Sequence, residues 1–251
     1  MNRKPLIAGN WKMFKTGGEA VLTAKRLAEL SIDVNDTDIM IAPTFLSLPL
    51  VAEVVKGTNI KTGAQNLFYE NQGAYTGEVS GEMIKAAGAQ YVIIGHSERR
   101  QYFMETNDTV RKKIKAAIKA DLIPVLCVGE TEIQRDEDKA FFILDKQIGD
   151  GLKGFHSDEL KNLIIAYEPV WAIGTGKTAS RDQVNEIHQF IRSVIRTMFG
   201  GEFADSIRIL YGGSVKPENV SDLMALKEVD GALVGGASLD ADTFIKIIKF
   251  K

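Results

Sequence analysis

The chain has 251 residues, a formal net charge of −2 and a sequence pI of about 6.0. Because nucleic-acid-binding proteins usually carry an excess of basic residues, this balance argues against a nucleic-acid partner. Hydrophobic residues make up 45% of the chain and charged residues 25%, which rules out an intrinsically disordered protein and predicts a globular one with a large core.

Short apolar runs recur along the chain at close to the roughly 30-residue spacing of a strand–helix unit. Most of them are apolar throughout, as expected for strands that are buried on both faces of a sheet. They occupy residues 6–8, 39–41, 60–62, 91–94, 123–126, 163–166, 207–210 and 232–234.

Amphipathic segments with helical spacing lie between these runs. We expect helices at residues 19–31, 108–120, 180–198 and 240–247, with Ser180 as the N-cap of the third. Eight strand–helix units predict one closed (β/α)8 barrel, an α/β fold with eight parallel strands ringed by helices, as a single domain over residues 1–251.

An open doubly wound sheet is the alternative fold. Its dinucleotide-binding form requires a Gly-x-Gly-x-x-Gly sequence directly after an early strand. The first apolar run is instead followed by Gly9-Asn10-Trp11-Lys12, which favours the barrel.

The sequence also predicts a compartment. No apolar run approaches the roughly 18 residues of a membrane span, so no membrane partner is expected. The first residues lack the apolar core of a signal peptide. Cys127 is the single cysteine and cannot form an internal disulfide, which is compatible with a reducing environment. We therefore expect a cytoplasmic protein.

Side chains that carry chemistry follow the apolar runs. In a barrel of this kind the active site lies at the carboxyl ends of the strands, so these side chains should gather at one rim. We expect a site that contains a lysine, a histidine and several glutamates. The residues are Asn10, Lys12, Gln65, Asn66, His96, Glu98, Glu130 and Glu168.

Two glycine pairs, Gly212-Gly213 and Gly235-Gly236, follow the last two runs. Without a Cβ atom, backbone N–H groups can approach a ligand closely, and this fold commonly binds phosphate after its seventh and eighth strands. We therefore predict a phosphate site there; the alternative is that the pairs are only tight turns. The segment 174–178 resembles the end of a nucleotide-binding loop, but Trp171 stands where that loop needs its first glycine, so we interpret residues 169–178 as a lid.

The remaining titratable residues show no further site. His96, His156 and His188 lack the spacing of metal ligands, so no metal is expected. We interpret His156 and His188 as structural or solvated. The basic runs 99–100 and 111–113 are interpreted as exposed or ion-paired surface.

At this point the motifs resemble those of the triosephosphate isomerase family. They are Asn10-Trp11-Lys12 and the segments 95–100, 166–177 and 211–215, and the match runs from Pro5 to the last predicted helix. The resemblance implies a TIM barrel that interconverts dihydroxyacetone phosphate and D-glyceraldehyde 3-phosphate through an enediolate, in glycolysis and gluconeogenesis, with no cofactor.

The resemblance also implies residue roles. Glu168 would be the base that moves the proton, and His96 the neutral electrophile that polarises the carbonyl. Lys12 would offset the negative charge of the phosphate and enediolate, and Asn10 would help to orient the substrate. The phosphate would bind Gly174, Ser214, Gly235 and Gly236 besides Asn10 and Lys12. Lid and supporting residues would be Glu98, Glu130, Tyr167, Trp171, Ile173, Tyr211 and Leu233.

A homodimer is the last implication. The loop at residues 65–78 is too apolar to be free in solution, since it carries Leu67, Phe68, Tyr69 and Tyr75. In the family this loop enters the partner subunit, where Thr76 would approach the site.

Two other functions fit parts of the pattern. A Schiff-base aldolase on the same fold would use Lys12 as its nucleophile, which requires a desolvated lysine. A non-catalytic sugar-phosphate binder would tolerate the loss of Glu168 or His96, and both are present. An assay for isomerisation of dihydroxyacetone phosphate separates both alternatives from the isomerase.

Overall fold

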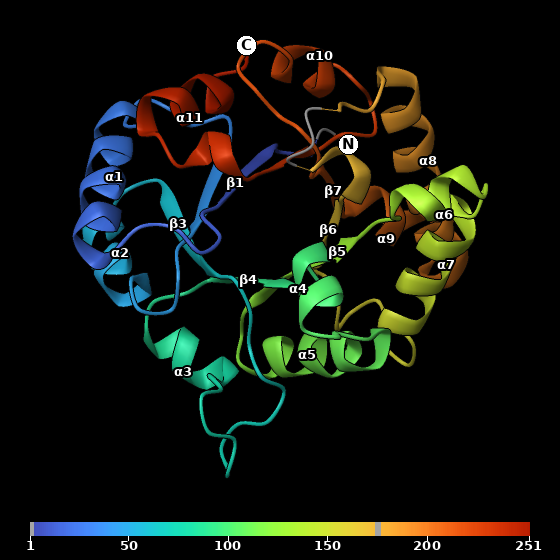
Figure 1. Cartoon of the computed structure of the whole chain (residues 1–251), viewed down its shortest axis with the longest axis horizontal. Helices are drawn as coiled ribbons and strands as arrows, with labels where there is room; N and C mark the ends of the chain where they lie inside the picture. The colour runs from blue at the N-terminus through green and yellow to red at the C-terminus, as the bar shows by residue number, and fades with distance from the viewer. Residues whose placement is uncertain (1–2, 174–176) are drawn as a thin grey trace.

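A computed structural model describes residues 3–173 and 177–251 of the chain. Eight parallel strands pair in chain order and close into a barrel, which helices surround (Figure 1). The predicted fold is confirmed, and the open-sheet alternative is excluded because β1 pairs with both β2 and β8. The strands are β1 (Leu6–Asn10), β2 (Asp38–Ala42), β3 (Ile60–Ala64), β4 (Tyr91–Ile94), β5 (Ile123–Val128), β6 (Ile164–Tyr167), β7 (Arg208–Tyr211) and β8 (Gly231–Val234).

The four predicted helices are present with ends shifted by one or two residues. Ser180 begins the third of them as predicted, because its hydroxyl accepts a hydrogen bond from the Gln183 amide. The helical segments described are α1 (Gly17–Leu30), α2 (Leu48–Val55), α3 (Gly81–Ala86), α4 (Ser97–Tyr102), α5 (Asn107–Lys119), α6 (Glu132–Asp136), α7 (Ala140–Gly151), η1 (Val170–Ala172), α8 (Arg181–Phe199), α9 (Gly201–Ser206), α10 (Val220–Met224), η2 (Gly236–Ser238) and α11 (Ala241–Ile248). None of them combines the length and the apolarity that a membrane-spanning helix needs.

Side-chain alternation along the strands builds two separate cores. In β1, Leu6 and Ala8 belong to a cluster that fills the barrel interior, whereas Ile7 packs in the layer between strands and helices. The period of two places successive side chains on opposite faces, and both faces are covered here. The apolar runs therefore read as continuous rather than alternating, which is the pattern that identified the strands.

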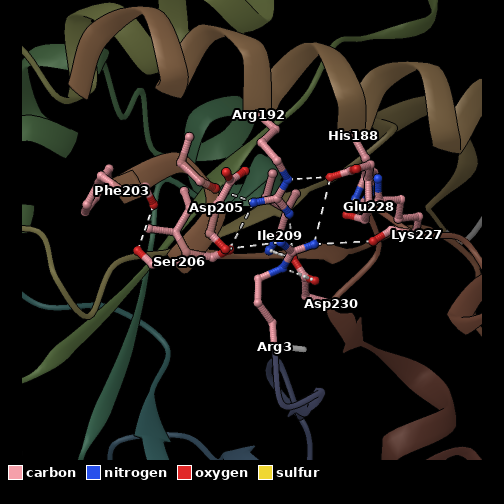
Figure 2. Close-up of polar contacts among 12 residues, drawn as sticks. Arg3, His188, Arg192, Phe203, Asp205, Ser206, Ile209, Lys227, Glu228 and Asp230 are labelled. Carbon is pink, nitrogen blue, oxygen red and sulfur yellow. Dashed lines mark hydrogen bonds and ion pairs between the residues drawn. The ribbon is translucent and has the colours of Figure 1, made fainter. Parts of the chain in front are cut away.

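Buried charges join the amino-terminal ends of the strands. Figure 2 shows Arg192 of α8 and Arg3 converging on Asp230, with Arg3 Nε at 2.5 Å and Arg192 Nη2 at 2.7 Å from the carboxylate oxygens. Asp230 also accepts a hydrogen bond from the Ile209 amide at 2.9 Å. Removing one member of such a buried cluster is strongly destabilising, so the cluster holds β7 and β8 to the start of the chain. The predicted site residues follow the carboxyl ends of the strands, at the opposite end of the barrel.

The loop at residues 65–78 extends beyond the ring of helices next to α3 (Figure 1). Leu67 is fully buried in the core of this chain. The expectation that it adds to an exposed apolar surface is therefore wrong. Phe68 packs against the rings of Tyr69 and Tyr75, with centroids 4.3 and 4.7 Å apart. Tyr75 remains exposed.

Candidate active site

A cavity of about 250 Å³ opens at the carboxyl ends of the strands. It brings together side chains that are far apart in the sequence, and nine of the predicted site residues line it. The predicted residues around the cavity are Asn10, Lys12, His96, Glu168, Ile173, Ser214, Leu233, Gly235 and Gly236. Gly174, which was also predicted, lies outside the described residues.

His96 and Glu168 are in direct contact within this cavity. Nε2 of His96 lies 2.9 Å from Oε1 of Glu168, and Oε2 of Glu168 accepts a hydrogen bond from the Ser97 amide at 3.0 Å. His96 is the N-cap of α4, and its Nδ1 accepts a hydrogen bond from the Glu98 amide at 3.2 Å. Because Nδ1 accepts, we assign the proton of a neutral imidazole to Nε2, facing the glutamate.

Opposing effects act on the charges of this pair. Burial by itself raises the pKa of Glu168, but the contacts with His96, the Ser97 amide and Lys12 hold it below its ordinary value. Burial lowers the pKa of His96, but the contacts with Glu168 and the charge of Glu98 together raise it above its ordinary value. The Glu98 amide at Nδ1 disfavours a second proton on the ring. In this resting arrangement Glu168 is therefore an ionised carboxylate, and His96 donates to it.

Lys12 has an unusual backbone conformation. Its φ of +49° lies in the left-handed region, which non-glycine residues rarely occupy. Local hydrogen bonds hold it there: its amide donates to Asn10 Oδ1 at 3.0 Å, and its carbonyl accepts from Gln65 Nε2 at 2.8 Å. The side chain points into the cavity, where Nζ lies 2.6 Å from Glu98 Oε1.

The two glycine pairs line the same cavity beside Ser214. A Cβ on Gly212 would lie 2.9 Å from Cγ of Glu168, and one on Gly213 would lie 2.2 Å from the Tyr211 hydroxyl. The first pair is therefore required by packing within the chain. A Cβ on Gly236 would meet nothing within 4 Å, so this backbone faces open space, as a ligand-binding turn requires.

Glu130 anchors the start of the predicted lid. This fully buried carboxylate accepts hydrogen bonds at one oxygen from Tyr167 at 3.1 Å, Trp171 at 2.8 Å and Arg135 at 3.0 Å. Burial and the Glu130 charge raise the pKa of Tyr167, which keeps that hydroxyl a donor. Trp171 belongs to η1, so its indole ties the first turn of the lid to the loop after β5.

Tyr211 ends β7 and lies close to the backbone of Ala179, which follows the predicted lid in sequence. Burial raises its pKa to about 12, and the neighbouring Ala179 backbone offsets part of that effect. Ala179 is close to the hydroxyl but does not complete a hydrogen bond, so the oxygen has no partner among the described residues.

Sequence reasoning missed several contributors to the site. The Ser97 amide binds Glu168, and a Cβ on Gly129 would lie 1.7 Å from the Glu168 carbonyl oxygen, so that position admits only glycine. Gln65 was noted only as a polar residue at a strand end. Gln65 and Gly129 each follow a strand directly, and that position is the one signal in the sequence. It does not predict which part of the backbone each residue will contact.

The interpretation of the two basic runs as surface is wrong for two of their residues. Lys113 is buried and paired with Glu105, and its Nζ donates to Asn66 at 2.7 Å. Arg100 is partly buried and donates to backbone carbonyls instead of reaching solvent. Because one side of each helix packs against the rest of the molecule, one basic residue of each run faces inward.

His188 is fully buried within α8 and His156 is exposed, as structural and solvated roles require. Within residues 3–173 and 177–251, no cluster of three or more histidine, cysteine or acidic side chains is arranged to hold a metal ion.

The chain is similar to known proteins over nearly its whole length. The family model described as Triosephosphate isomerase matches residues 5–251. The triosephosphate isomerase of Geotalea uraniireducens is 56% identical over 248 residues, which cover 99% of each protein. That of Clostridium botulinum is 52% identical and covers 99% of this chain and 100% of the relative. A crystal structure of the Bartonella henselae triosephosphate isomerase superposes with a TM-score of 0.89 at 40% identity, over 98% of both chains.

Proposed function

This chain belongs to the triosephosphate isomerase family, and from that premise we propose that its cavity interconverts dihydroxyacetone phosphate and D-glyceraldehyde 3-phosphate, in glycolysis and gluconeogenesis. The resemblance inferred from four short motifs is thus confirmed along nearly the whole chain. The observation that carries the residue assignment is the contact of Glu168 with His96 in a cavity that Lys12 also lines.

Glu168 is the base of the proposed reaction. Its carboxylate leaves the Ser97 amide, accepts a proton from the carbon next to the substrate carbonyl, and returns that proton to the neighbouring carbon. The Nε2–H group of His96, released from Glu168, then donates to the substrate oxygens. A neutral donor can stabilise the enediolate and also exchange its proton with it.

Lys12 supplies the fixed positive charge. An enediolate phosphate is strongly anionic, and a preorganised cation at the site of charge development lowers the barrier to its formation. Asn10 supports this geometry through its hydrogen bond to the Lys12 amide. The phosphate group lies against Ser214, Gly235 and Gly236, with Gly174 as the expected contact from the lid.

The lid protects the intermediate. An enediol phosphate loses its phosphate readily, so water must be excluded while the proton is transferred. Ile173 from the lid and Leu233 from β8 both line the cavity beside Glu168. Closure would bring these apolar side chains around the carboxylate. Glu130, Tyr167 and Trp171 hold the first turn of the lid.

An aldolase function is disfavoured by the surroundings of Lys12. Nζ is paired with the Glu98 carboxylate at 2.6 Å, so the amine is already engaged in an ion pair. A Schiff-base nucleophile must be uncharged. Borohydride trapping of substrate on Lys12 would support the aldolase.

A coupled assay of dihydroxyacetone phosphate isomerisation tests the proposed function, with Glu168→Gln as the matched variant. We expect activity in the unmodified chain and a loss of roughly 10³-fold or more in the variant, because no other carboxylate lines the cavity within the described residues. Binding of substrate without turnover in the unmodified chain would support the non-catalytic binder instead.

The chain also acts as a homodimer in this proposal, through the loop at residues 65–78. Apolar side chains on the segments that follow β1 to β4 are exposed and would be covered by a second copy. Thr76 would then approach Asn10 and His96 of the partner subunit. The exposed residues are Met13, Phe14, Leu46, Tyr75, Met83, Tyr102, Phe103 and Met104. Sedimentation that shows an active monomer at micromolar concentration would contradict the dimer.

We further place the protein in the cytoplasm and treat residues 1–251 as one domain. The buried free thiol of Cys127 supports a reducing compartment. Cell fractionation tests the first statement. The second predicts a single cooperative unfolding transition of the dimer or monomer, which calorimetry measures.

A further inference from the structure

Arg100 turns back beneath the segment that carries the two key donors of the site. It lies in α4, three residues after Ser97 and four after the N-cap His96. Its Nε donates to the Gly95 carbonyl at 2.8 Å, and its Nη2 to the Cys127 carbonyl at 3.2 Å. Its Nη1 donates to Asn107 Oδ1 at 2.7 Å, in the first turn of α5. One guanidinium thus joins the ends of β4 and β5 to the start of α5.

The backbone at Gly95 leaves the space that this guanidinium occupies. Gly95 has a φ of +74°, and a Cβ there would lie 2.9 Å from Nη2 of Arg100 and 3.2 Å from the Cys127 carbonyl. Gly95 is the residue before His96, so its carbonyl belongs to the peptide group that leads into the imidazole. Cys127 pairs in register with Ala166 of β6, the strand that ends just before Glu168. Arg100 therefore contacts the carbonyl directly before His96 and a β5 carbonyl next to the strand that leads to Glu168.

The charge of Arg100 has no local counterion. Its three acceptors are two carbonyls and an amide, all neutral. Within the described parts of the chain no carboxylate lies within ion-pair distance of it, in contrast to Arg99, which pairs with Glu105 at 3.6 Å. Burial lowers the pKa of Arg100, while the nearby Cys127, Glu105 and Glu168 act in the opposite direction. Even with a lowered pKa, a guanidinium stays protonated near neutral pH.

Arg100 does not line the substrate cavity. It borders a separate cavity of about 680 Å³ together with Ser97 and Glu168. Any effect on turnover must therefore pass through other residues, and direct contact with substrate is not involved.

We propose that Arg100 is a positioning residue of the isomerase: its fork of hydrogen bonds fixes the turn that presents His96 Nε2 and the Ser97 amide to Glu168, and its uncompensated charge stabilises the Glu168 carboxylate at that place. This role rests on the proposed isomerase function. Bidentate donation from a planar guanidinium sets the orientation of both carbonyls, which a lysine ammonium cannot reproduce.

The test compares Arg100→Gln, Arg100→Lys and the unmodified chain. We expect Arg100→Gln to lower kcat about tenfold and to leave KM within about twofold, because the phosphate-binding turns are untouched. The carbon-13 resonance of the Glu168 carboxyl, assigned by its loss in Glu168→Gln, should titrate at a higher pH than in the unmodified chain. Arg100→Lys should restore that titration but not kcat. Arg111→Gln, which removes a surface pair with Asp108, is the matched control and should change neither.

A second variant keeps the test decisive if Arg100→Gln does not fold. Asn107→Asp keeps an oxygen acceptor for each of the three Arg100 hydrogen bonds and places a carboxylate against the guanidinium. It also replaces the 3.2 Å hydrogen bond from Asn107 to Asp150 with repulsion between two carboxylates. Because it neutralises the charge, it should also raise the Glu168 titration. The charged and titratable groups facing Glu168, namely His96, Lys12 and Cys127, are unchanged in it.

The proposal is overturned if kcat and the Glu168 titration of folded Arg100→Gln match the unmodified chain, or if Asn107→Asp leaves the titration in place. Absence of isomerisation by the unmodified chain would instead refute the proposed function, so the two failures are distinguishable.

Discussion

Nζ of Lys12 lies 2.6 Å from Oε1 of Glu98, so the cation that faces the substrate cavity already has a carboxylate partner. Both side chains are partly exposed, and pairs of this kind contribute little to stability. An anionic substrate can therefore compete for the ammonium group at small cost. The pair keeps the Lys12 side chain oriented between turnovers.

Lys12→Met should lose roughly 10²-fold or more in kcat/KM, at least about 2.7 kcal/mol of transition-state stabilisation, because it removes the fixed charge. The fold should survive, since the side chain is not part of the core. Steady-state kinetics with thermal unfolding measure both. Lys15→Met is a suitable control because its ammonium packs over Trp11 and bonds Thr23, outside the cavity. Activity of Lys12→Met within tenfold of the parent would refute the role.

Tyr211→Phe should lower turnover and release more of the intermediate as methylglyoxal and free phosphate. The Tyr211 hydroxyl lies beside the Ala179 backbone, and we expect it to complete a hydrogen bond there when the lid closes. Losing that bond destabilises the closed lid by about 1 kcal/mol. The ratio of elimination to isomerisation measures it. Tyr91→Phe removes a hydroxyl at the other end of the barrel and should leave the ratio unchanged.

Glu168 should become a stronger base when ligand closes the lid. In the resting arrangement its hydrogen-bond donors hold its pKa low, and moving it toward apolar Ile173 and Leu233 removes donors and water. Titration of its carboxyl resonance with and without phosphoglycolate should show a rise on binding.

Ile173→Ala should admit water, reduce that rise and lower turnover more than substrate binding. Ile133→Ala, an exposed isoleucine outside the cavity, is the matched control. An intact rise in Ile173→Ala would disprove the apolar clamp, although Glu168 would remain the base.

His188 should make stability depend on pH below neutrality. Burial lowers its pKa to about 4 from an ordinary 6.5, and its Nδ1 donates to the Glu228 carbonyl at 3.0 Å. Between these values the unfolded chain binds a proton that the folded chain does not. The free energy of unfolding therefore decreases as pH falls from 6.5 to 4, by about 3 kcal/mol from this group. Urea unfolding across this range should show a smaller decrease in His188→Gln, whereas exposed His156→Gln should follow the parent.

The elements predictable from sequence are those that a local pattern determines. Buried parallel strands are apolar on both faces, and a hydroxyl such as that of Ser180 caps a helix with its own side chain. The candidate site residues follow strands, so strand prediction also placed them at one rim. His96 and Glu168 were expected there, and their cavity is now described.

The rest depends on packing from distant segments. Arg99 and Arg100 are adjacent in a short helix, so their side chains point about 100° apart, and no local pattern says which one turns inward. Arg100 faces inward because the carbonyls of Gly95 and Cys127 accept its hydrogen bonds. Leu67 was assigned to an exposed loop for the same reason, since the core that covers it comes from other parts of the chain. Direct contacts of Gln65 and Gly129 are equally non-local.

The cluster of Arg3, Arg192 and Asp230 has a consequence for the order of events during synthesis. The bond from Arg3 to Asp230 spans 227 positions in sequence, so Arg3 cannot form it until Asp230 has been translated. β1 cannot find its second neighbour until β8 has left the ribosome. Until then the nascent barrel has two unpaired sheet edges and an uncovered interior, and both close in a single late step.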